Sequence, residues 1–271
     1  MACQLGYHVL KFETKSTHKA NDLFYLYDAL GRFQAKQLEE KVKKTQDYIT
    51  YKALGLAILL ANEPEVVQAF LPSNFASHIK HILGADFEFN QPQRSIVLVD
   101  EIDKAPRDFP NNILNEVEKS YFYVPELGEL GNKAIEAPAN KQPILVLTSN
   151  GEKILPDAFL RRCIYYNIPF PDEERLQKII AIRLAAQIED INYFLTDALQ
   201  LFWQLREAGL RKKPSTAELL NWLLVLREVF KEAEKNPFKG LEKIHLTLNT
   251  LVKTAEDQEL AKRVLERFLK K

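Results

Sequence analysis

The feature that most restricts the fold of this 271-residue chain is a continuous apolar run that ends in two acids. Residues Ser95–Val99 are rich in β-branched side chains, and Asp100 and Glu101 follow them directly. A strand that is apolar on both faces is typical of a parallel sheet covered on both sides. The run therefore predicts an interior strand of an α/β fold, with an acidic pair at its carboxyl end.

Three other segments predict strands: His8–Phe12, Pro143–Asn150 and Cys163–Phe170. The pattern between them predicts helices over residues 21–33, 51–61, 109–120 and 156–162. Tyr121–Pro138 holds aromatic residues followed by glycines and predicts a hairpin or loop insertion. From Pro171 the pattern is almost entirely helical, so we expect an α/β domain at 1–170 and an all-α domain at 171–271.

The acidic pair suits nucleotide hydrolysis. Asp100 can hold Mg²⁺ because a hard cation prefers carboxylate oxygen. Glu101 can polarise an attacking water, and Asn150, at the end of the Pro143–Asn150 strand, can help to orient that water. The alternative is that the two acids only cap the turn that follows the strand.

Bulk composition gives little reason to expect a charged partner. Lys+Arg and Asp+Glu are both 37, and this balance disfavours nucleic acid and anionic membrane as partners. The two cysteines lie far apart in sequence, which fits a reducing compartment. No apolar stretch approaches the ~20 residues that span a bilayer, and the N-terminus does not read as a signal peptide. We expect a soluble, cytoplasmic protein.

Four segments, in the same order along the chain, resemble motifs of AAA+ ATPases, especially the MoxR-like branch. Ile96–Ala105 resembles the Walker B segment, and Leu147–Asn150 resembles the sensor 1 strand. Leu155–Cys163 is similar to the helix that carries the arginine finger, and Gly209–Thr216 lies where sensor 2 would fall. Tyr121–Pro138 resembles the hairpin that this branch inserts before sensor 1.

The resemblance implies a role for each matching residue. Asp100 would position Mg²⁺, Glu101 would activate water and Asn150 would orient it. Arg162, or its neighbour Arg161, would reach the nucleotide of an adjacent subunit; the alternative is an arginine that pairs with a helix C-terminus. Arg211 and Lys213 would contact phosphate from the sensor 2 region, or else form a basic loop in solvent.

The resemblance also implies cofactors and partners. The cofactors would be ATP and Mg²⁺. The chain would assemble into a ring, a hexamer as in relatives, and would couple ATP hydrolysis to remodelling or maturation of a protein client. In relatives such a client can be a von Willebrand A-type domain protein. A clamp-loader-like protein that handles DNA is a further alternative, which the zero net charge disfavours.

One motif of the family is missing. No Gly-x-x-x-x-Gly-Lys-Ser/Thr loop occurs in the sequence, although the family uses that loop to hold the phosphates. Two explanations stay open. The loop lies upstream of the given start, so that the chain is truncated, or the chain is a degenerate, non-catalytic subunit that supplies arginines to a partner ring. In the family's sheet, the strand that precedes the loop would lie beside Cys163–Phe170, so that segment lacks a neighbour on one side.

Overall fold

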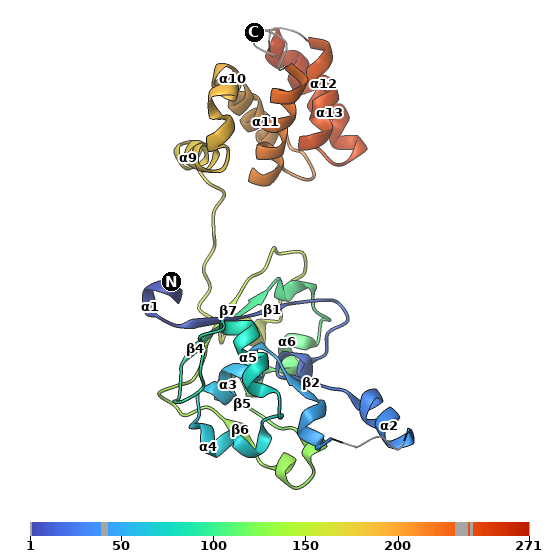
Figure 1. Cartoon of the computed structure of the whole chain (residues 1–271). Helices are drawn as coiled ribbons and strands as arrows, with labels where there is room; N and C mark the ends of the chain where they lie inside the picture. Colours follow the sequence, from blue (N-terminus) through green and yellow to red (C-terminus); the bar gives the residue numbers. More distant parts are fainter. Residues whose placement is uncertain (1, 39–42, 231–237, 239–240, 271) are drawn as a thin grey trace. The chain divides into compact units, whose positions relative to one another are not determined.

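The computed structural model describes residues 2–38, 43–230, 238 and 241–270 and divides into two compact units (Figure 1). The first unit is Met1–Tyr166 and the second is Asn167–Lys271. The division falls a few residues before the predicted boundary at Phe170–Pro171. Each unit is described by itself.

The first unit is built on a three-stranded parallel sheet in the order β1 (His8–Glu13), β4 (Ser95–Asp100), β7 (Ile144–Leu147). The apolar run at Ser95–Val99 forms the central strand, where Val97 and Val99 are completely buried. The predicted α/β class is confirmed at this level. The register carries Asp100 and the residue after β7 to the same end of the sheet.

One face of the sheet is covered by α3 (Ala53–Leu60), whose eight residues are all buried. This helix packs against β1 and β4. A side chain at Gly55 would place its Cβ 2.0 Å from the Phe24 carbonyl oxygen, so glycine is required for the close approach of the helix to that segment. This unit also contains the helices α1 (Ala2–Leu5), α4 (Pro64–Val67), α5 (Phe75–Leu83), α6 (Phe109–Asn112), α7 (Leu114–Lys119) and α8 (Asp157–Leu160).

Two predicted helices differ in the structure. Residues 21–33 do not form one helix: β2 (Tyr25–Tyr27) pairs antiparallel with β3 (Ile49–Tyr51), and α2 (Ala29–Gln37) starts only afterwards. The Asp28 carboxylate caps α2 by accepting a hydrogen bond from the Gly31 amide at 2.8 Å. The predicted helix at 109–120 is interrupted between α6 and α7. The predicted hairpin at Tyr121–Pro138 is confirmed, because β5 (Tyr121–Phe122) pairs antiparallel with β6 (Ile135–Glu136).

The predicted strand at Cys163–Phe170 is wrong. The segment is irregular, and Figure 1 draws it as a coil. Within the described part of the chain the segment pairs with no strand, and its apolar side chains stay in solvent. Ile164 is fully exposed, and Ile168 is 80% exposed. Phe170 belongs to the second unit instead, where the Arg206 guanidinium lies 3.3 Å from its ring centroid.

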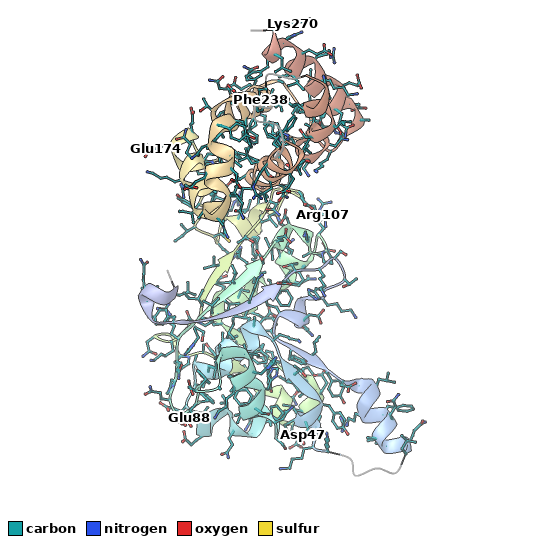
Figure 2. The ribbon with its side chains drawn as sticks, turned by 45° about the horizontal axis from the view of Figure 1, so that its top comes forward. Asp47, Glu88, Arg107, Glu174, Phe238 and Lys270 are labelled. Carbon is teal, nitrogen blue, oxygen red and sulfur yellow. The ribbon has the colours of Figure 1, made fainter. Side chains whose placement is uncertain are left out.

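The second unit is helical. Its helices are α9 (Glu173–Arg183), α10 (Ile188–Glu207), α11 (Thr216–Phe230), α12 (Leu241–Leu251) and α13 (Ala255–Leu269). They enclose an apolar core around Trp222, whose indole N–H donates to the Thr247 hydroxyl at 2.8 Å. Phe238 lies among the helices of this unit (Figure 2). Its ring is edge-on to the Trp222 ring. None of the described helices is long and apolar enough to cross a bilayer.

Candidate functional site

The candidate site lies where β4 and β7 end side by side. The ladder continues one residue beyond β7, because the Thr148 amide donates to the Val99 carbonyl at 3.0 Å. The Thr148 hydroxyl donates to Asp100 Oδ1 at 2.6 Å and accepts the Glu101 amide at 2.8 Å. Thr148 therefore fixes both the Asp100 carboxylate and the backbone that turns away from the strand.

Glu101 is held in an unusual backbone conformation. Its φ is +55°, in the left-handed region that non-glycine residues rarely adopt. Its Oε1 accepts the Asn150 side-chain amide at 2.7 Å, and its Oε2 pairs with the Lys104 ammonium. A residue with an unfavourable backbone conformation often marks a functional position. At Glu101 the carboxylate is also held by two side chains. The structure thus brings together Asp100, Glu101 and Asn150, all three predicted for this site.

Asp103 is a positioning residue that the sequence interpretation did not single out. It is 2% exposed, and it accepts backbone amides from Glu152 at 2.9 Å and from Asn150 at 3.4 Å. Burial acts to raise the pKa of this carboxyl, but the backbone hydrogen bonds outweigh burial and hold the pKa below its usual range. The signal in the sequence was a third acid two residues after Glu101, but nothing local showed that its side chain would turn inward.

Two lysines neutralise the acidic pair. The Lys11 ammonium lies 3.1 Å from Asp100 Oδ2 and 2.9 Å from Glu13 Oε1, and Lys104 contacts Glu101. The Thr148 hydroxyl and then Lys11 lower the pKa of Asp100, so this carboxyl is ionised at neutral pH. The hydrogen bond to Glu101 raises the pKa of Lys104. Neither lysine was predicted for the site.

The predicted arginines have other partners or face solvent. Arg162 pairs with Glu118 through its Nε at 3.0 Å and donates to the Ala158 carbonyl at 2.8 Å. Arg161 follows α8 with an exposed side chain. Both residues lie in the first unit, but the structure does not place either on the acidic pair.

The sensor 2 candidates lie in the second unit. The Asp257 carboxylate accepts the Arg211 amide at 2.9 Å and the Lys212 amide at 3.1 Å, and so fixes the loop before α11. The side chains of Arg211 and Lys213 are exposed. The Asp257 contact is a structural reason for the conformation of this loop that the sequence interpretation did not contain.

The residues present fit Mg²⁺ only in part. Among the described residues, no group of three or more His, Cys, Asp or Glu side chains converges as a metal site. Both oxygens of Asp100 already have partners, in Thr148 and Lys11. Mg²⁺ is commonly held by one or two carboxylates together with substrate phosphates and waters. Asp100 therefore fits as a single ligand whose remaining partners would come from a bound nucleotide.

Comparison with known proteins does not assign a family. No protein-family model matches the chain, and no curated protein matches it. The class of the molecule therefore rests on its coordinates: an α/β unit with a three-stranded parallel sheet, and an all-helical unit. A carboxyl-end site on a parallel sheet is where α/β proteins usually bind ligands.

Proposed function

We propose that the chain is an ATPase subunit of the MoxR-like AAA+ group and that the cluster at the ends of β4 and β7 is the hydrolytic half of its site. The observation that carries the proposal is the joint placement of Asp100, Glu101 and Asn150, with the Asn150 amide 2.7 Å from Glu101 Oε1. Enzymes of phosphoryl transfer use a carboxylate that binds the metal ion and a polar residue that positions the attacking water. Asp100, Glu101 and Asn150 supply side chains of these kinds at the ends of neighbouring parallel strands.

Each residue has a defined task in this proposal. Asp100 would hold Mg²⁺, and the ion would neutralise charge on the phosphate oxygens when nucleotide is bound. Glu101 accepts a proton from water, and Asn150 and Lys104 orient its carboxylate. Thr148 keeps Asp100 beside Glu101. Arg162 or Arg161 serves a neighbouring subunit in a ring, and ATP turnover drives remodelling of a protein client in the cytoplasm.

The test is phosphate release from ATP by the full chain, with and without Mg²⁺. We expect Mg²⁺-dependent turnover that Glu101→Gln lowers by at least about 100-fold, the usual contribution of a general base. The matched control is Glu63→Gln, which removes the same charge from an exposed residue elsewhere in the first unit. Turnover that is equal in the wild type and in Glu101→Gln would remove Glu101 from the mechanism.

A second candidate function is a non-catalytic AAA+ interaction subunit that supplies arginines to a partner ring. Two observations favour it: the sequence holds no Gly-x-x-x-x-Gly-Lys-Ser/Thr loop, and lysines already occupy both acids of the pair. Equilibrium binding of labelled ATP separates the two functions. Submicromolar, Mg²⁺-dependent binding supports the ATPase, and absence of binding at millimolar ATP supports the interaction subunit.

A further inference from the structure

We propose that a groove beside α4 and α5 binds an extended peptide segment of a protein partner, one that carries apolar and basic side chains. The groove lies in the first unit and reaches His8, the first residue of β1. It is therefore at the end of the sheet opposite to the acidic pair, and the inference does not depend on the proposed ATPase. Three features support it: the shape of the groove, its apolar floor and the charge of its rim.

The groove consists of two neighbouring hollows of about 580 and 470 Å³. The larger one lies between α4, α5 and the loop that follows α5, and the smaller one lies between this loop and His8. Phe87 and Glu88 of the loop line both hollows. Each volume is in the range of ligand sites in proteins. Two hollows that share a wall suit an extended chain, because its alternate side chains lie roughly 7 Å apart on one face.

The floor of the groove is apolar and held in place. Phe75 and Ile79 of α5 are buried, and so is Phe87. The rings of Phe75 and Phe89 lie edge-on with their centroids 6.1 Å apart, and the His8 ring lies edge-on to Phe87 at 5.0 Å. Apolar side chains of an occupant would pack on this floor. Aromatic rings also attract an ammonium or guanidinium group.

The rim of the groove is acidic. Among the described lining residues, Glu65, Asp86 and Glu88 carry exposed carboxylates, against the single ammonium of Lys80. Within the described ranges no cationic side chain forms an ion pair with any of these three carboxylates. Glu88 lies at the surface of the first unit (Figure 2) and accepts the Asn90 side-chain amide at 2.9 Å. The unpaired negative charge favours a basic occupant.

The competing explanation is a surface hollow between short helices that has no partner. The two explanations differ in what they predict for the charge of a bound peptide. A hollow that only offers apolar surface would hold peptides of either charge equally weakly. A docking groove with an acidic rim would select basic side chains between the apolar ones.

The test measures the binding of two fluorescein-labelled peptides to the full chain by fluorescence anisotropy. One peptide alternates leucine and lysine, and the other alternates leucine and glutamate at the same length. We expect the lysine peptide to bind about tenfold more tightly, since each exposed ion pair contributes little by itself. Glu65→Gln combined with Glu88→Gln should reduce this preference to about threefold or less. Glu63→Gln combined with Glu129→Gln is the matched control, because both residues are exposed in the first unit outside the groove.

A second arm locates the peptide. Ala76 is exposed on α5 and lines the groove, so Ala76→Trp should fill the groove and prevent binding. Ser77→Trp, at the next exposed position and outside the lining, is the control. Ala76→Leu serves instead if circular dichroism shows that Ala76→Trp does not fold. Equal affinity of the wild type for the two peptides would overturn the proposal. So would absence of binding at millimolar peptide, or binding of the lysine peptide that the substitutions at Ala76, Glu65 and Glu88 leave unchanged.

Discussion

Replacement of Asp103 by asparagine tests whether this buried carboxylate holds the loop that carries Asn150. The substitution keeps the shape of the side chain and removes its charge. Asp103 is 2% exposed and accepts two backbone amides, from Glu152 at 2.9 Å and from Asn150 at 3.4 Å. An asparagine can offer one carbonyl oxygen, but its amide group would then face a backbone N–H that needs an acceptor.

The magnitude follows from the contacts. A hydrogen bond to a charged group is worth about 1.5–3 kcal/mol, and the shorter bond, to Glu152, should carry most of it. We therefore expect Asp103→Asn to lower the free energy of unfolding of the first unit by about 2 kcal/mol. For a unit of this size the midpoint of thermal unfolding should fall by roughly 4–8 °C.

The sign of the pH dependence gives a second readout. The pKa of Asp103 lies below its usual value in the folded chain, so its contribution is present above the unfolded pKa, near 4. The contribution is lost as pH falls through the folded pKa. The difference in stability between the wild type and Asp103→Asn should therefore be full at pH 7 and should shrink as the pH is lowered below about 4.

The two tryptophans make the assay specific for each unit. Trp203 and Trp222 both lie in the second unit, so their fluorescence during urea unfolding reports that unit alone. Circular dichroism reports both units. Asp103→Asn should shift only the dichroism, and Asp108→Asn, at an exposed position, should shift neither signal. If Asp103→Asn is as stable as Asp108→Asn, the reasoning about the buried carboxylate is refuted.

Two other substitutions test the backbone at Glu101 and the loop at Asp257. Glu101 has φ +55°, in the left-handed region. Glu101→Gly should therefore be more stable in urea than Glu101→Ala by about 1 kcal/mol, because a Cβ atom is disfavoured in that region and glycine has none. Equal stability of the two variants would show that the conformation carries no strain. The hydrogen bond from the Arg211 amide lowers the pKa of Asp257. Burial acts to raise this pKa, but together with the hydrogen bond from the Lys212 amide the net effect holds it below its usual range. Its contribution is therefore lost as pH falls. Asp257→Asn should flatten the acid dependence of tryptophan-monitored unfolding, with Glu256→Gln as control, and an unchanged slope would contradict the assignment.

The strands of the sheet could be predicted because their information is local. Ser95–Val99 is apolar without interruption, which suits only a position buried on both faces, and it forms the central strand. The helix predicted for residues 21–33 was wrong because the competing interaction is distant. Tyr25–Tyr27 pairs with Ile49–Tyr51, and no pattern within residues 21–33 reveals that partner. Helical spacing of apolar residues is thus outweighed by strand pairing.

The site residues also fall into those that the sequence could predict and those that it could not. Asp100, Glu101 and Asn150 could be predicted to meet, since the carboxyl ends of parallel strands lie at one edge of the sheet. Lys11 could not, because its contact with Asp100 depends on the register of two strands that are far apart in the chain. Asp103 could not either, because its inward orientation depends on the left-handed turn at Glu101. The acids could be identified from the local sequence, whereas the lysines that balance their charge are placed by tertiary structure.

The strand predicted at Cys163–Phe170 does not form, and the reason is again non-local. Apolar composition favours a strand, but a strand forms only where a neighbour satisfies its backbone hydrogen bonds. Among the described strands β7 has a partner on one edge only, and Ile164, Tyr165 and Tyr166 remain largely exposed.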